Sequence, residues 1–244
     1  MATRLVLLGA SNLTTGLPTA LATAGARLGP GPMDVLVAAG HGRSYGRWSR
    51  VLVRGLPAIL DCGLWPVLAA AGRPSHALLT DIGNDIAYGA EPAELAGWVD
   101  ACLARLSGAR AIVTLLPMAR LTRLAPWQYH LFKAALFPGR RLPFRVFRAR
   151  LGEVNARLGD LGARHGAAVV EPPAGWYGAD PIHVTRGREG AAWAAILAAW
   201  GIGKADTRVT CRSLAPAWRT VCGVSLHRRQ PAAVLDNGTT ISLF

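Results

Sequence analysis

Short apolar runs alternate along this chain with longer amphipathic stretches, and the two kinds of segment predict strands and helices. Five runs bounded by Gly, Pro or polar residues have the length of buried strands, at residues 4–8, 34–38, 76–80, 111–116 and 167–170. Helices are predicted at residues 18–28, 48–71, 91–106, 144–165 and 188–200. This alternation predicts an α/β fold, a three-layer sandwich in which helices cover both faces of a central parallel sheet of about five strands.

The pattern changes after residue 204, where only short extended pieces remain. Asn237-Gly238 separates two of these pieces and is typical of a hairpin turn. We therefore expect an α/β domain over residues 1–204 and a small β-rich C-terminal extension over residues 205–244. The irregular segment at residues 118–150 follows the fourth strand and is expected to form a lid or insertion beside the rim of the sheet.

Composition places the chain among globular proteins. Its 244 residues are 51% hydrophobic, which is enough to bury a large core in one domain. The apolar run at residues 5–10 gives way to polar residues from Ser11 onward, which favours a mature cytoplasmic start over a signal peptide. The longest apolar stretch, residues 55–72, contains Asp61 and two prolines, so no segment is expected to span a bilayer.

The four cysteines form no Cys-x-x-Cys pair and no Cys/His spacing typical of zinc ligands. We therefore expect neither a metal nor a cofactor. Cys62 and Cys102 lie in apolar patterns and are predicted to be buried thiols, whereas Cys211 and Cys222 would pair only in an oxidising compartment.

The formal net charge is +13, and one interval concentrates it. Residues 101–152, called here the basic window, contain nine Arg and Lys133 but no Asp or Glu. Such a window predicts an anionic substrate or partner, and its aromatic residues add a peripheral membrane contact as a possibility. Nucleic acid is disfavoured because no nucleic-acid-binding module accompanies the charge. The alternative is a solvated surface whose aromatic residues pack on the core.

Polar segments that follow the predicted strands carry the candidate chemistry. Ser11 follows the first strand, Gly40-His41-Gly42 the second, Gly83-Asn84 the third, and Asp180-Pro181-Ile182-His183 the fifth. The carboxyl ends of parallel strands meet at one rim, where α/β proteins bind their ligands. An Asp three residues before a His can orient the imidazole, and an imidazole can activate a serine hydroxyl. Glycine N–H groups and an Asn amide can bind a developing oxyanion.

In this order, over residues 4–200, the motifs resemble the SGNH branch of the GDSL esterase and lipase superfamily. The resemblance implies a flavodoxin-like SGNH fold and a metal-independent serine hydrolase that cleaves small-molecule carboxylic esters through an acyl-enzyme. It also implies that Ser11 is the nucleophile, His183 the general base and Asp180 its orienting partner. The implied oxyanion donors are Ser11, Gly42 and Asn84.

The chain departs from the family pattern in two places. The acid that usually precedes the serine is Ala10 here. The glycine donor is also not uniquely placed, because Gly40 and Gly46 lie in the same loop as Gly42, which we choose because Gly42-Arg43-Ser44 is most similar to the family segment.

A rival motif lies in that loop. Gly42-Arg43-Ser44-Tyr45-Gly46 matches the Gly-x-Ser-x-Gly nucleophile elbow of α/β-hydrolases, and Asp180 and His183 follow in the correct order. Only two predicted strands precede Ser44, whereas that elbow needs several, and an elbow would leave Ser11 and Asn84 without a role.

Two other functions use the same motifs. One is an acyltransferase in which an alcohol replaces water, and the other is a non-catalytic protein that holds an anionic partner through the basic window. The sequence leaves open the acyl and alcohol groups and the oligomeric state.

Other polar residues near the motifs carry smaller expectations. Asp85 is predicted to hold its loop by accepting backbone hydrogen bonds, and Asp81 to point away from Asn84 if its strand continues. His41 is a candidate for lining the crevice. Four arginines expected to steer an anionic substrate cluster around the predicted lid tip at Pro138-Gly139, namely Arg140, Arg141, Arg145 and Arg148.

Overall fold

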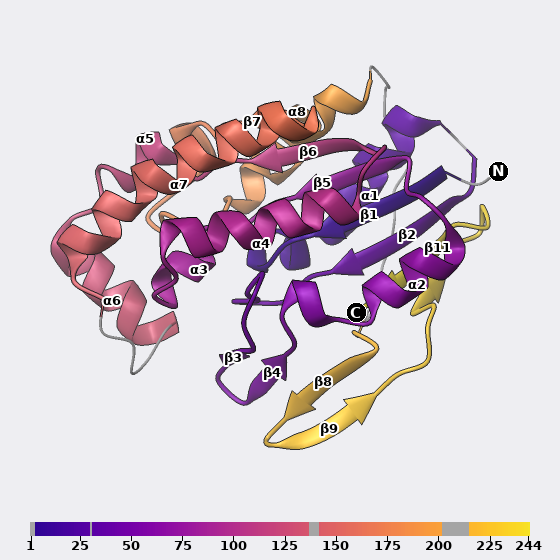
Figure 1. The fold of residues 1–244 in the computed structure, drawn as a ribbon, viewed down its shortest axis with the longest axis horizontal. Helices are drawn as coiled ribbons and strands as arrows, with labels where there is room; N and C mark the ends of the chain where they lie inside the picture. Colours follow the sequence, from indigo (N-terminus) through magenta and orange to yellow (C-terminus); the bar gives the residue numbers. More distant parts are fainter. Residues whose placement is uncertain (1–2, 30, 137–141, 202–214) are drawn as a thin grey trace.

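The computed structural model describes residues 3–29, 31–136, 142–201 and 215–244. A seven-stranded sheet with the order β10-β11-β2-β1-β5-β6-β7 forms its centre (Figure 1). The five strands predicted from apolar runs are all present and mutually parallel: β1 (Thr3–Leu8), β2 (Met33–Ala38), β5 (His76–Leu79), β6 (Arg110–Thr114) and β7 (Ala168–Val170).

The C-terminal residues complete this sheet. β11 (Thr240–Leu243) pairs in parallel with β2, and β10 (Ala233–Val234) pairs antiparallel with β11. Ile241 is completely buried among the side chains of the main core. The predicted hairpin at Asn237-Gly238 is confirmed, but the expectation of a separate extension does not hold for these strands. The predicted boundary at residue 204 lies outside the described residues.

Helices cover both faces of the sheet (Figure 1). One face carries α1 (Ser11–Leu28), α8 (Glu189–Ile196) and the 3₁₀ helix η4 (Leu197–Trp200). The other face carries α2 (Leu64–Ala71), α3 (Asn84–Ala87), α4 (Pro92–Arg105) and α7 (Phe144–His165). Each face has its own cluster of buried apolar side chains, so the three-layer α/β prediction is confirmed.

The single helix predicted for residues 48–71 is wrong. Its first part is a hairpin of β3 (Ser49–Val51) and β4 (Arg54–Leu56), followed by the 3₁₀ helix η1 (Ile59–Asp61) and then α2. These strands form a second, antiparallel sheet with β8 (Trp218–Val221) and β9 (Val224–His227), in the order β3-β4-β8-β9. β4 pairs with β8, whose residues lie more than 160 positions later in the chain, and local periodicity cannot indicate such a partner.

The segment predicted as a lid folds into α5 (Met118–Leu121), α6 (Pro126–Leu136) and the start of α7. Tyr129 and Phe147 are buried, with their ring centroids 4.8 Å apart, so these aromatic side chains pack on the core. Arg145 and Arg148 are exposed on α7. The predicted tip at Pro138-Gly139, with Arg140 and Arg141, lies outside the described residues.

Cys62 and Cys102 are buried free thiols, as predicted, and Cys222 is an exposed free thiol. Cys211 lies outside the described residues. Among the helices that the structure describes, none combines the length and apolar character needed to cross a membrane.

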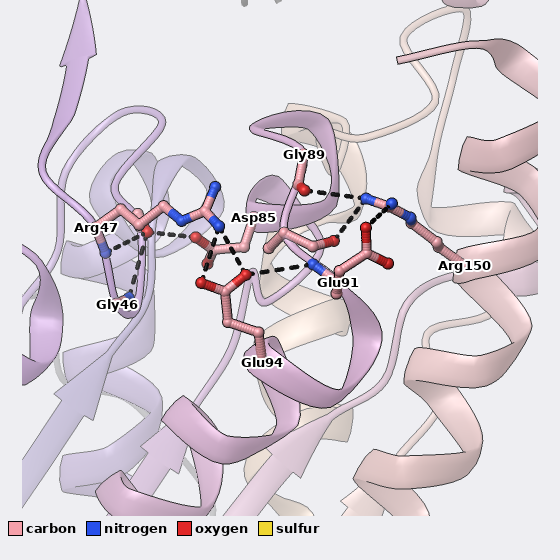
Figure 2. A network of polar contacts seen from close by, with 9 residues as sticks. Gly46, Arg47, Asp85, Gly89, Glu91, Glu94 and Arg150 are labelled. Carbon is pink, nitrogen blue, oxygen red and sulfur yellow. Dashed lines mark hydrogen bonds and ion pairs between the residues drawn. The ribbon is translucent and has the colours of Figure 1, made fainter. Parts of the chain in front are cut away.

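A polar network ties the glycine loop to Asp85 of α3 and Glu94 of α4 (Figure 2). The hydroxyl of Ser44 donates to the completely buried Asp85, whose other oxygen accepts the N–H of Tyr45 at 3.0 Å. Ser44 Oγ in turn accepts the N–H of Arg47 at 2.9 Å, and the guanidinium of Arg47 pairs with Glu94 of α4 at 2.6 Å. Asp85 accepts a backbone hydrogen bond, as predicted, but the donor Tyr45 lies in the glycine loop and not in the loop of Asp85 itself.

Burial raises the pKa of Asp85 to about 7, although hydrogen bonds from Ser44 and Tyr45 oppose the shift. In the unfolded chain the same carboxyl ionises near pH 4, at roughly pKa 3.9. The folded state therefore binds more protons than the unfolded state between about pH 4 and pH 7. Asp85 contributes fully to the free energy of unfolding below that window, and the contribution is lost as the pH rises through about 7.

We expect Ser44→Ala to lower the free energy of unfolding by about 1–3 kcal/mol, because the buried Asp85 loses a hydrogen-bond donor. The loss should be larger at pH 8 than at pH 5, because an ionised acceptor gains more from a hydroxyl donor. Urea unfolding at both pH values measures the effect, with the exposed Ser225→Ala as the control. Equal losses at the two pH values would contradict a titrating Asp85.

Candidate active site

Ser11 is the first residue of α1 and is separated from β1 only by Gly9-Ala10. A side chain at Gly9 would place its Cβ 2.7 Å from Thr80 Cγ2, so this tight link requires glycine. The predicted helix start at residue 18 is too late, because α1 begins seven residues earlier. Ser11 thus lies at the N-terminal end of an 18-residue helix, where unpaired N–H groups and the helix dipole favour negative charge.

His183 connects Ser11 to Asp180. Nε2 of His183 is 2.9 Å from Ser11 Oγ, and Nδ1 is 2.6 Å from Asp180 Oδ2. A carboxylate only accepts hydrogen bonds, so Nδ1 is the donor and Nε2 of the neutral ring faces the serine hydroxyl as an acceptor. The other oxygen of Asp180 accepts the N–H groups of Ile182 at 2.9 Å and His183 at 3.2 Å. The structure therefore brings together all three residues of the predicted triad.

The Asp180–His183 contact shifts the pKa of both groups. The hydrogen bond that His183 donates to Asp180 raises the pKa of His183, burial opposes the shift, and the charges of Asp180 and Asp81 add to it. Partial burial tends to raise the pKa of Asp180, but the hydrogen bond to His183 and two backbone N–H groups outweigh it and lower that pKa. This environment stabilises an imidazolium that has accepted a proton.

Asn12 fixes the loop of His183 to α1, a contact that the sequence analysis did not foresee. Its Nδ2 donates to the carbonyl of Ile182 at 3.0 Å, and its Oδ1 accepts the N–H of Val184 at 2.9 Å. The residues on both sides of His183 are therefore bound by the neighbour of Ser11. This arrangement sets the relative position of the hydroxyl and the imidazole.

Asp81 binds the start of α1, a role that the sequence did not predict. One carboxylate oxygen accepts the N–H groups of Ala10 at 2.9 Å and Leu13 at 3.1 Å, and the other accepts Asn12 Nδ2 at 2.8 Å. The predicted orientation of Asp81 depended on continuation of the strand to this residue. β5 instead ends at Leu79, and Asp81 has a left-handed φ of +59°. Ala10, which stands where the family has an acid, was the departure from the family pattern beside Ser11, but it did not indicate which residue binds this helix end.

Asn84 lines the same cavity as Ser11 and His183, which agrees with its predicted place on the rim. Its Nδ2 is buried and has no hydrogen-bond partner among the residues that the structure describes. A buried amide without an acceptor costs about 1–3 kcal/mol. An oxygen atom of a bound molecule would satisfy this donor.

The three glycines of the neighbouring loop differ in conformation. Gly42 alone among them has a positive φ, +64°, and its carbonyl accepts the hydroxyl of Tyr88 at 2.7 Å. The N–H of Gly46 already donates to Ser44 Oγ at 3.3 Å, which argues against Gly46 as a free donor. Gly40 and Gly42 remain candidates, and neither glycine lines the cavity.

The cavity has a volume of about 210 Å³. Its polar residues, including Ser11, His183 and Asn84, lie beside a larger apolar wall contributed by β6, α5, α6 and α7. Buried members of that wall are Leu116, Leu121, Leu124, Tyr129, Phe147 and Leu151. His41 is exposed, and burial of part of its ring, together with the nearby His183 and Arg54, lowers its pKa.

Ser44 is in a different environment from Ser11. It is completely buried and its hydroxyl donates to Asp85, whereas the ring nitrogens of His183 contact Ser11 and Asp180. This geometry disfavours the elbow alternative. Among the described parts of the chain, no group of three His, Cys, Asp or Glu side chains is arranged to hold a metal ion.

No protein-family model and no curated protein matches this chain. Among solved structures, that of TesA aligns with 81% of this chain and 97% of its own, at 17% identity and a TM-score of 0.51. A psychrotrophic esterase EstA from Pseudoalteromonas sp. aligns over 80% of this chain and 97% of its own, at 11% identity and a TM-score of 0.49. A carbohydrate acetylesterase family member from Sinorhizobium meliloti aligns over 80% and 95%, at 15% identity and a TM-score of 0.49. The similarity to TesA shows a shared fold, in agreement with the α/β fold predicted from the sequence.

Proposed function

We propose that this protein is a serine hydrolase that cleaves carboxylic esters through an acyl-enzyme at Ser11, without a metal. The observation that carries the proposal is the hydrogen-bonded series Asp180–His183–Ser11 at a cavity that Asn84 also lines, with a buried Nδ2 that has no partner among the described residues. Proton acceptor, oxygen nucleophile and oxyanion donor are the three groups that acyl transfer requires.

In the first half of the reaction, Ser11 Oγ attacks the ester carbonyl while its proton moves to Nε2 of His183. Asp180 stabilises the imidazolium through Nδ1–H. The carbonyl oxygen becomes an oxyanion, which accepts hydrogen bonds from Asn84 Nδ2 and from backbone N–H groups of Ser11 and Gly42. His183 then gives the proton to the departing alkoxide, which leaves as an alcohol, and the acyl group stays on Ser11.

In the second half, His183 takes a proton from water, and the resulting attack releases a carboxylic acid and restores the serine. Transfer to an alcohol would use the same residues, with the alcohol in place of water. The apolar wall beside Ser11 suits the hydrocarbon part of a small ester, because burying such a group there removes it from water. The exposed Arg145 and Arg148 of α7 are the described arginines proposed to attract an anionic substrate.

We expect Ser11→Ala and His183→Ala each to lower the hydrolysis of short-chain aryl esters by about 10⁴-fold or more, because the triad acts as a unit. A fluorophosphonate probe should label wild-type protein stoichiometrically on Ser11, as mass spectrometry of the peptides would reveal. A folded protein that neither reacts with the probe nor hydrolyses esters favours the non-catalytic alternative. Full activity in Ser11→Ala together with a loss in Ser44→Ala favours the elbow.

Asn84→Ala should lower kcat by about 10²–10³-fold and change KM much less, because the amide acts on the developing oxyanion. Asn84→Asp is the matched variant, since it keeps the size of the side chain but replaces the donor with an acceptor. Steady-state kinetics should find it at least as inactive as Asn84→Ala. Recovery of kcat in Asn84→Asp would assign Asn84 a purely structural role.

Asp81→Asn tests the positioning of Ser11 and His183. We expect kcat to fall by about 10–100-fold, because small displacements of reacting groups are costly. Removing this negative charge also lowers the pKa of His183, so the acidic limb of the pH profile of kcat/KM should shift to lower pH. The exposed Asp236→Asn is the control. An unchanged pH profile would limit Asp81 to a role in stability.

A further inference from the structure

The turns of two hairpins lie side by side at one end of the small antiparallel sheet. β4 pairs with β8, and the N–H of Cys222 in the β8–β9 turn donates to the carbonyl of Val53 in the β3–β4 turn at 2.9 Å. Both hairpins extend from the same side of the main domain (Figure 1). We call residues 50–54 and 219–224 together the hairpin surface.

The hairpin surface exposes aliphatic side chains at its tips. Leu52 is 84% exposed, Val224 is 61% exposed and Val53 is 45% exposed. Leu52 and Val53 form the turn between β3 and β4, and Val224 begins β9 directly after the turn whose Cys222 binds the Val53 carbonyl. Exposed apolar side chains gathered at one end of a sheet are typical of interaction sites.

Leu52 is the most informative of these residues because its backbone is also unfavourable. It has a φ of +53°, in the left-handed region that a bulky residue such as leucine rarely occupies. An exposed leucine in this conformation contributes neither burial nor a relaxed backbone to the fold. Tight hairpin turns require a left-handed φ, which Cys222 in the adjacent turn also has, so the backbone alone does not call for leucine here. Burial of the leucine side chain against something outside this chain would explain why an apolar residue stands at this exposed position.

The charge around the tips is entirely positive. Arg50 and Arg54 flank Leu52 and Val53 and are exposed, and Arg219 lies in the adjacent strand. The two chain segments that build this sheet, residues 43–60 and 215–235, contain no Asp or Glu. None of these three arginines forms an ion pair with another residue that the structure describes.

We infer that the hairpin surface docks on a lipid surface with anionic headgroups, with Leu52, Val53 and Val224 entering the apolar layer and the arginines binding phosphate groups. Aliphatic tips ringed by guanidinium groups match the two layers of such a surface. A second copy of the chain would instead place like charges against each other, and nucleic acid would offer the aliphatic tips little apolar surface.

The hairpin surface adjoins the glycine loop. Val51 of the same hairpin packs on Gly42, so closely that a Cβ at Gly42 would lie 2.4 Å from Val51 Cγ2. The binding itself does not depend on the chemistry of Ser11. A variant without the serine hydroxyl can therefore test docking separately from hydrolysis.

The experiment is flotation of the Ser11→Ala protein with vesicles of phosphatidylcholine alone or with 30% phosphatidylglycerol. We expect binding to the anionic vesicles, weakening as salt rises. Leu52→Asn should reduce it about tenfold, because the apolar contact is lost. Asn adopts the left-handed region more easily than Leu, so this variant should be no less stable, which thermal unfolding checks. Arg50→Gln and Arg54→Gln should each reduce binding about fivefold.

Val234→Asn is the matched control, because Val234 is 64% exposed on β10, outside the hairpin surface. Its binding should equal that of the parent protein. Absence of binding to anionic vesicles, equal binding to neutral ones, or unchanged binding by Leu52→Asn would each overturn the inference. A dimer in size-exclusion chromatography that Leu52→Asn abolishes, without vesicle binding, would overturn it in favour of contact between two copies.

Discussion

The carboxylate of Asp81 is the contact on which the candidate site depends. It binds the N–H groups of Ala10 and Leu13 at the start of α1 and the side chain of Asn12, which in turn binds both sides of His183. Ser11 and His183 are 172 positions apart in the sequence and meet only because these contacts fix two loops to one helix end. A carboxylate suits this place, since the first turn of a helix has unpaired N–H groups and a positive dipole end.

A second carboxylate, Asp85, organises the other side of the site at a cost in stability. Its contacts with Ser44 and Tyr45 join the glycine loop to the turn that carries Asn84, but they require a completely buried acid. Burial disfavours the ionised carboxylate of Asp85, which is why its pKa is raised to about 7. The unpaired Nδ2 of Asn84 is a further unfavourable group in the adjacent position. Unfavourable features that cluster beside one cavity are typical of sites organised for binding or catalysis.

The sequence predicted the elements that local patterns encode. The five parallel strands were recognisable as apolar runs, and the spacing of Asp180 and His183 identified a pair that can form within one turn. The sequence of β3 and β4 was predicted to be part of a helix because each strand is only three residues long. The partner of β4 outside the hairpin is β8, which lies far along the chain. Asp81 and Asn12 act through contacts that span about 70 and 170 positions, and no local spacing reports such contacts. The missing acid at position 10 indicated only that something must replace it.

Much of the positive charge serves the fold and not a partner. Arg43 is completely buried and donates to the carbonyls of Pro57 and Phe244, and Arg150 donates to the carbonyls of Gly89 and Ala90.

Arg120, also in the basic window, donates to the carbonyl of Gly178 in the segment that leads to Asp180. A planar guanidinium has five N–H donors, so it can satisfy several loop carbonyls at once, and an ammonium group does this less well. Net charge alone therefore overstates the tendency to bind anions. Exposed arginines that form no ion pair with another described residue, such as Arg50 and Arg54 of the hairpin surface, are the ones whose charge can act on a partner.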